Sequence, residues 1–168
     1  MGYFGTIRSP RELILGSGQR HALGPAIKKL GTRILAITDQ RLAEDAEFLA
    51  LIAELESLGL EVRVDGGTLP DVPAETVTAA AARAREFSPE LVVGLGGGSC
   101  LDMAKCVALL LSHGGEPQDY YGELQVPGPV LPIVAVPTTA GTGSEVTPVA
   151  VLSDQNRNLK IGISSPYL

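Results

Sequence analysis

The sequence has no tryptophan and only two cysteines and two histidines among its 168 residues. Cys100 and Cys106 fall on one expected helix, on different faces and about 9 Å apart along its axis, which is too far for a disulfide. Free thiols fit a reducing compartment, so we expect a cytoplasmic protein. His21 and His113 are too few for a metal site, and the cysteines lack metal-ligand spacing.

The sequence also lacks a basic cluster and a long hydrophobic run. Its formal net charge is -6, and its lysines and arginines are scattered, which argues against nucleic-acid and anionic-membrane surfaces. No apolar segment approaches the length of a bilayer span, and the start of the chain has no signal-peptide core. We therefore expect neither nucleic-acid nor membrane partners.

What the sequence does contain is a regular alternation of short apolar runs and amphipathic segments. Because 45% of the residues are hydrophobic, the chain can bury the core of one α/β domain. After a loose lead-in over residues 1–10, the pattern predicts strands at 12–15, 33–38, 61–64, 91–95 and 132–136, with helices at 22–30, 43–58, 74–87 and 99–112. Residues 113–130 form a connection, and 149–152 and 159–163 a β-hairpin. This order predicts a doubly wound, mainly parallel, Rossmann-like sheet with a terminal antiparallel β-hairpin.

Three consecutive glycines, Gly96, Gly97 and Gly98, separate the strand at 91–95 from the helix at 99–112. A strand, a glycine loop and a helix N-terminus are typical of phosphate binding, because free N–H groups of the first turn point at the anion. The alternative is a tight turn whose helix is capped by Ser99, with Asp102 at capping-box distance. Three glycines exceed what a cap requires, so we favour phosphate binding.

A second glycine pair, Gly16 and Gly18, follows the expected strand at 12–15. It is half of a dinucleotide fingerprint whose third glycine position holds His21, so it ranks below the first loop. Asp39 follows about twenty residues later, at the end of the strand at 33–38, where a carboxylate can bind both hydroxyls of an adenosine ribose. Capping of the next helix by Asp39 is about equally plausible.

The strand at 132–136 ends in a segment rich in small polar residues. Seven of the twelve residues at 137–148 are Thr, Ser or Gly. Ligands of open α/β sheets sit at the carboxyl ends of strands, and small hydroxyls and bare backbone suit a cofactor there. The alternative is that this composition serves only as a turn.

Two motifs together carry a resemblance to a known family. They are Gly96-Gly97-Gly98-Ser99-x-x-Asp102-x-Ala104-Lys105 and Pro137-Thr138-Thr139-Ala140-Gly141-Thr142-Gly143-Ser144-Glu145-Val146-Thr147-Pro148. The chain resembles the iron-containing (group III) alcohol dehydrogenases along essentially its whole length. That resemblance implies an N-terminal dinucleotide-binding domain, an all-helical C-terminal domain and an active site in the cleft between them.

The resemblance also implies roles for particular residues. Gly97, Gly98 and Ser99 would hold the pyrophosphate, and Asp39 the adenosine ribose, which favours NAD over NADP. Thr138 and Thr139 would line the adenine side. The nicotinamide half would lie near a further group: Asp102, Thr142, Ser144, Thr147 and Val149, with Lys160 near its ribose.

The family's metal, divalent iron or zinc, is held by one Asp and three His of the helical domain, and the resemblance ends before any of them. We expect residues 1–168 to be the NAD-binding domain of a metal-dependent alcohol dehydrogenase that transfers hydride between an alcohol/aldehyde pair and NAD(H). Without the helical domain it should bind NAD weakly and not turn over its small alcohol or aldehyde.

The edge that meets the helical domain should be exposed and apolar, which predicts a homo-oligomer or a disordered carboxyl-terminal tail. Two alternatives for the function stay open. One is the cofactor domain of a related glycerol dehydrogenase, maleylacetate reductase or dehydroquinate synthase. The other is a non-catalytic nucleotide-binding module.

Overall fold

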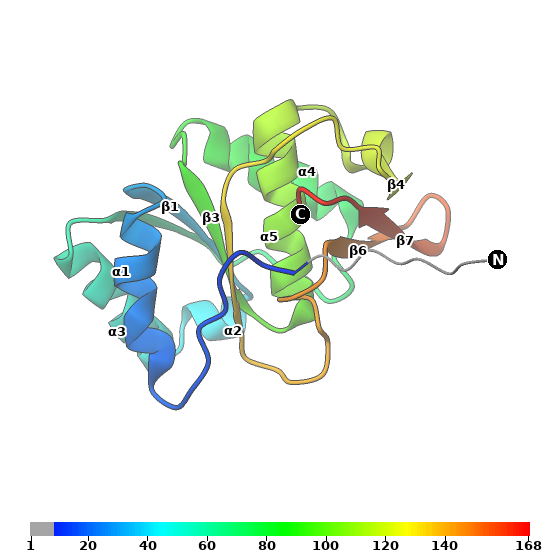
Figure 1. The fold of residues 1–168 in the computed structure, drawn as a ribbon. Coiled ribbons are helices and arrows are strands. Elements are labelled where there is room, and N and C mark those ends of the chain that lie inside the picture. Colours follow the sequence, from blue (N-terminus) through cyan, green and yellow to red (C-terminus); the bar gives the residue numbers. More distant parts are fainter. Residues whose placement is uncertain (1–8) are drawn as a thin grey trace.

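A four-stranded parallel sheet forms the centre of the computed structural model, which describes residues 9–168 (Figure 1). Residues 1–8 of the expected lead-in lie outside the described residues. The strand order is β2-β1-β3-β5, with β1 Arg33–Ile37, β2 Glu61–Asp65, β3 Leu91–Gly96 and β5 Ile133–Pro137. All six residues of β3 are buried, as expected for an interior parallel strand covered on both faces.

Helices cover both faces of this sheet, which confirms the doubly wound arrangement. On β1, Ile34 and Ala36 join one apolar cluster while Leu35 and Ile37 join the other, because successive side chains of a strand point to opposite faces. The first cluster includes side chains of α1 (Leu23–Lys28) and α3 (Ala46–Ser57). The second includes side chains of α4 (Ala74–Arg85) and α5 (Gly98–His113).

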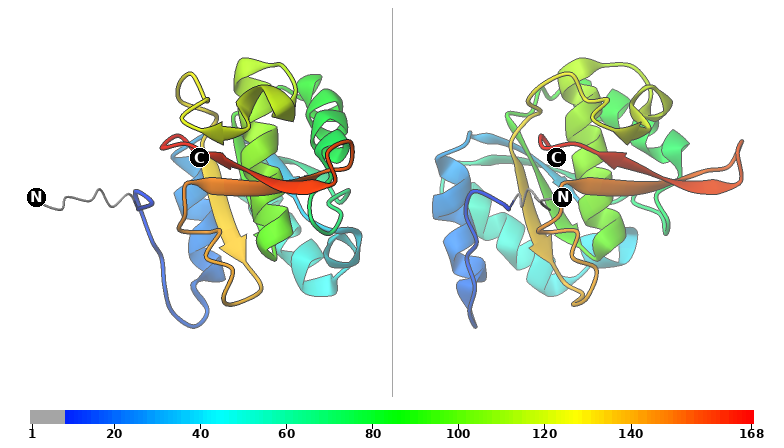
Figure 2. Two further views of the ribbon diagram at one scale, coloured as in Figure 1. Left: turned by 90° about the vertical axis from the view of Figure 1, so that its right-hand side faces the viewer. Right: turned by 45° about the vertical axis from the view of Figure 1, so that its right-hand side comes forward.

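The expected hairpin is confirmed, and it belongs to a separate three-stranded sheet. Strands β6 (Val149–Asp154) and β7 (Leu159–Ser164) are antiparallel, and β4 (Gly122–Glu123) pairs with β7 in parallel. Figure 2 shows the hairpin lying across α5, and Ala150, Leu152 and Ile163 join the cluster that contains α5. Helix α5 is therefore buried between two sheets, which explains its ten buried residues.

The remaining elements are short. They are η1 (Gln19–Ala22), α2 (Gln40–Ala43) and η2 (Pro117–Tyr120). Leu168 packs against the apolar cluster beside α5, and its N–H donates to the carbonyl of Ser165 at 3.1 Å, so the expected disordered tail is not observed. None of the helices in the described part of the chain has the length and apolar character that crossing a bilayer requires.

The expected strand at 12–15 is wrong. These residues form no strand, and the side chains of Leu13, Ile14 and Leu15 are exposed. An apolar run of four residues becomes a strand only where a neighbouring strand pairs with it, and the described residues offer this run no such partner. The half fingerprint at Gly16 and Gly18 consequently lacks the strand that a dinucleotide loop follows, so it is not a phosphate loop of that kind.

The sheet changes its direction of growth between β1 and β3. The chain passes from β1 outward to β2, then crosses back to place β3 on the other side of β1. In open α/β sheets, ligands bind at such a switch point, beyond the carboxyl ends of the strands. The two strand ends that meet there carry Asp39, shortly after β1, and the glycine loop after β3.

Candidate dinucleotide-binding site

The N-terminus of α5 carries no side-chain cap among the described residues. The helix begins at Gly98 with Gly97 as its N-cap, so Ser99 lies inside the first turn and the alternative of a Ser99 cap is wrong. Asp102 forms no capping box, because its carboxylate accepts bonds from Ser144 and Val151 instead. The first-turn N–H groups and the helix dipole can therefore act on an anionic ligand.

The glycine loop needs glycine for two different reasons. Gly96 has φ +143°, and a Cβ there would lie 2.5 Å from the Sγ of Cys100. Gly98 has ordinary backbone angles, but a Cβ there would lie 3.1 Å from the Cβ and the Cγ2 of Thr142. The loop thus packs closely against the first turn of α5 on one side and against the segment that follows β5 on the other.

That segment runs along the glycine loop. The N–H of Thr138 donates to the carbonyl of Gly96 at 2.9 Å. A Cβ on Gly97 would lie 3.4 Å from the Oγ1 of Thr139, so the two residues are neighbours. Thr138 and Thr139 are both exposed at this rim, which leaves their hydroxyls accessible to a ligand.

Asp39 lies at the same edge of the sheet, after β1. Its Oδ1 accepts the N–H of Leu42 at 2.8 Å and caps α2, so the capping role is confirmed. Its Oδ2 lies 3.9 Å from the Sγ of Cys100 in the first turn of α5. Burial and the charge of Asp39 raise the pKa of the Cys100 thiol. One half-exposed carboxylate thus caps a helix and borders the glycine loop, and its ribose-binding role stays a prediction.

An open cavity of about 280 Å³ lies against the first turn of α5. Five residues that the sequence singles out line it together: Gly98, Ser99, Asp102, Thr142 and Lys160. Asp71 and Val151 also line it, and sequence reasoning missed both. The Nζ of Lys160, on β7, lies 2.6 Å from the Oδ1 of Asp71, so an ion pair borders the cavity.

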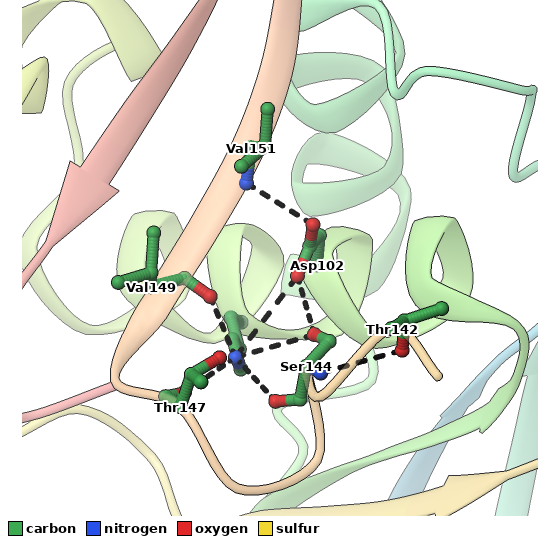
Figure 3. Close-up of polar contacts among 7 residues, drawn as sticks. Asp102, Thr142, Ser144, Thr147, Val149 and Val151 are labelled. Atoms are coloured by element: carbon green, nitrogen blue, oxygen red, sulfur yellow. Dashed lines mark hydrogen bonds and ion pairs between the residues drawn. The ribbon is translucent and has the colours of Figure 1, made fainter. Parts of the chain in front are cut away.

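Behind this cavity, side chains of α5 fasten the loop between β5 and β6 (Figure 3). Asp102 accepts the hydroxyl of Ser144 through Oδ1 and the N–H of Val151 through Oδ2, the latter at 3.1 Å. Burial raises the pKa of the Asp102 carboxyl, while these bonds and the charge of Lys105 act against that rise. Asp102 therefore joins the loop and β6 to the helix.

The sequence reasoning also missed the role of Lys105, which lies behind the cavity. Its Nζ donates to the carbonyls of Ser144, Thr147 and Val149 at 2.7, 2.8 and 2.7 Å. The signal was present, because Lys105 is one turn from Leu101 on the face expected to be buried. Lys105 thus holds the backbone at Ser144, Thr147 and Val149 behind the cavity. These three residues do not line the cavity itself.

The two histidines lie apart from this site. His21 is exposed beside Glu54, and His113, at the end of α5, lies within 3.2 Å of the carbonyls of Gly128 and Pro129. Within residues 9–168, no group of three or more His, Cys, Asp or Glu side chains could hold a metal ion. The described residues therefore do not fit the metal that the resemblance implies.

The sequence profile of the family described as iron-containing alcohol dehydrogenase matches residues 10–168. The chain belongs to this family. A long-chain-alcohol dehydrogenase of Geobacillus thermodenitrificans is 41% identical over 143 residues, which are 83% of this chain and 36% of that protein. An NAD-dependent methanol dehydrogenase of Bacillus methanolicus is 34% identical over 156 residues, 92% of this chain and 41% of that protein.

A solved structure of the family shares the fold. Sulfoacetaldehyde reductase from Bifidobacterium kashiwanohense, in complex with NAD+, superposes with a TM-score of 0.82 and 28% identity, covering 99% of this chain and 45% of that one. The chain thus spans less than half the length of these members of the iron-containing alcohol dehydrogenase family.

Proposed function

We propose that this chain is the dinucleotide-binding portion of an NAD-dependent alcohol dehydrogenase of the iron-containing family. The observation that carries the proposal is the uncapped N-terminus of α5, which lies at the switch point of the sheet beside an open cavity. The NAD-dependent methanol dehydrogenase and the NAD+ complex among its relatives support the choice of cofactor.

The pyrophosphate of NAD fits the start of α5. Gly97, Gly98 and Ser99 present backbone without a capping side chain, and the helix dipole adds a favourable field. Asp39, at the neighbouring strand end, would accept the adenosine ribose hydroxyls through Oδ2 and would repel a 2′-phosphate. Thr138 and Thr139 would border the adenine side of this path.

The nicotinamide half would then extend into the cavity lined by Asp102, Thr142 and Lys160. Lys160 is exposed and paired with Asp71 at its border, so its ammonium can move to a ribose hydroxyl or phosphate oxygen. NAD supplies hydride acceptance at its nicotinamide ring when bound. In the whole protein the reaction would interconvert a small alcohol and its aldehyde, and this chain alone would not turn it over, because the described residues form no metal site.

A pair of matched variants tests the role of Asp39. Asp39→Ser keeps a good helix cap but removes the carboxylate, and Asp45→Ser makes the same change at the cap of α3, where Asp45 accepts the N–H groups of Glu47 and Phe48. We expect only Asp39→Ser to lose the preference for NAD over NADP in calorimetric titrations. Equal loss in both variants, or no loss in either, would contradict the assignment.

Catalytic inactivity has its own test. A homogeneous sample of this chain, mixed with NAD, a divalent metal and a panel of short alcohols, should produce no NADH signal at 340 nm. Turnover by that sample would overturn the proposal that the chain is only the cofactor-binding portion.

A further inference from the structure

Lys105 places a charged group inside the domain. Its side chain is 4% exposed, on a helix that packs between two sheets. Its Nζ lies 2.7 to 2.8 Å from three backbone carbonyl oxygens, all from the loop and strand start at 144–149. An ammonium has three N–H donors, and each carbonyl takes one of them. A neutral amine has two donors and a lone pair, which would face the third carbonyl oxygen, so the geometry selects the charged form.

The charged groups that face this ammonium come from α5 and from the loop itself. The Oδ1 of Asp102 lies 4.0 Å from Nζ, Glu145 also acts on it by its charge, and burial keeps the neighbouring Cys106 thiol neutral. Burial lowers the pKa of Lys105 below its ordinary value, and the charges of Asp102 and Glu145 act against that fall without cancelling it. The three carbonyls and Asp102 together replace the water that a buried ammonium loses.

Besides Lys105, two other bonds tie the loop to the rest of the domain: the Ser144 hydroxyl donates to Asp102, and the Ser165 N–H donates to the Pro148 carbonyl at 3.0 Å. Gly141 and Gly143 both have positive φ, and the Val146 N–H to Gly143 carbonyl bond, 3.1 Å, closes a single turn. The Ser144 N–H donates to the Oγ1 of Thr142 at 3.3 Å, which sets the side chain of Thr142 at the cavity. Backbone this rich in glycine would sample many conformations without an anchor.

We propose that Lys105 is a positioning residue that holds the 142–149 loop in the conformation that lines the cavity, so that the nicotinamide half of the dinucleotide meets a preformed wall. This inference rests on the proposed function. Its physical basis is that one buried cation binds three carbonyls of a flexible segment, while Asp102 binds the hydroxyl of Ser144 from the same helix face. Lys105 does not line the cavity, so it acts through the loop and not on the cofactor.

The test compares Lys105→Met with a matched control, Lys28→Met. Lys28 also donates to a backbone carbonyl, that of Leu58 at 3.0 Å, on the far side of the sheet from α5. In hydrogen–deuterium exchange without ligand, Lys105→Met should speed exchange across 141–149 and leave β3 protected, while Lys28→Met should change neither. Unchanged exchange of the loop in Lys105→Met would overturn the proposal.

Calorimetric titration with NAD and with ADP separates the two halves of the cofactor. If the competent loop conformation falls to about a tenth of the population, the dissociation constant for NAD rises about tenfold, while that for ADP, which lacks the nicotinamide half, stays near its original value. Equal weakening of both ligands would overturn the proposal. A parent chain that binds neither ligand contradicts the proposed function, and the exchange comparison still decides the role of Lys105.

If Lys105→Met fails to fold, a second pair of variants at the same position tests the proposal. Lys105→Arg keeps the positive charge, and Lys105→Gln keeps only two neutral donors. The arginine variant should protect the 141–149 segment better than the glutamine variant and should bind NAD more tightly. Equal protection and equal affinity in the two variants would contradict a role for the charge.

Discussion

Gly96→Ala tests how tightly the glycine loop is built. Gly96 has φ +143°, where an L-residue is strained by about 1–3 kcal/mol. A Cβ would also lie 2.5 Å from the Sγ and 2.8 Å from the Cβ of Cys100, and overpacking of this kind typically costs about 1–3 kcal/mol. Together these effects should lower the free energy of unfolding by about 2–6 kcal/mol, a large part of the stability of a typical domain.

Two further glycines separate the two contributions. Gly59 has φ +81°, and a Cβ there would meet no heavy atom of the described residues within 4 Å, so Gly59→Ala measures backbone strain alone. Gly94 has ordinary φ, but its Cβ would lie 2.9 Å from the Cβ of Ala104, so Gly94→Ala measures crowding alone. Urea unfolding followed by circular dichroism gives all three free energies. If Gly96→Ala destabilises no more than Gly59→Ala, the packing of Cys100 against the loop is not as described.

Three further measurements test other parts of the structure. Thr32 and Arg33 donate to Glu90 and lower its pKa below the ordinary value of 4.5. The parent should therefore exceed Glu90→Leu in free energy of unfolding by a full margin above pH 4.5, and that margin should shrink as pH falls through the lowered pKa. A margin that does not change with pH in urea unfolding would refute this. Burial raises the pKa of both thiols, so neither Cys100 nor Cys106 should react with a disulfide reagent at pH 8 until the chain unfolds, and rapid labelling of the native chain would refute it. Self-association stays a prediction, and a monomer at high concentration in sedimentation would contradict it.

The sheet could be predicted because its signals are local and strong. After Arg33 the residues of β1 are all apolar, β3 holds only Leu, Val and Gly, and the glycines at its end mark the turn into α5. Residues 12–15 have the same local appearance and form no strand, because pairing depends on a neighbour that sequence pattern does not reveal. The conformation of residues 12–15 therefore depends on tertiary contacts, not on the local sequence.

The site also has some features that local sequence predicts and others that depend on distant contacts. The glycine loop and the Thr-rich segment were recognisable, since their composition itself is unusual. Asp71 borders the cavity through contacts with distant strands: its carbonyl accepts the N–H of Ser153 on β6, and its carboxylate pairs with Lys160 on β7, 89 residues away along the chain. Lys105 is similar, since its three carbonyl partners lie on a distant loop, although a lysine on the expected buried face was a usable sign.

The most direct test of the account is calorimetric titration of this chain with NAD, and with NADP as the comparison. We predict saturable binding of NAD at a single site and weaker binding of NADP, because the carboxylate of Asp39 repels the 2′-phosphate. A folded chain, verified by circular dichroism, that binds neither dinucleotide would contradict the claim that the start of α5 is a cofactor site.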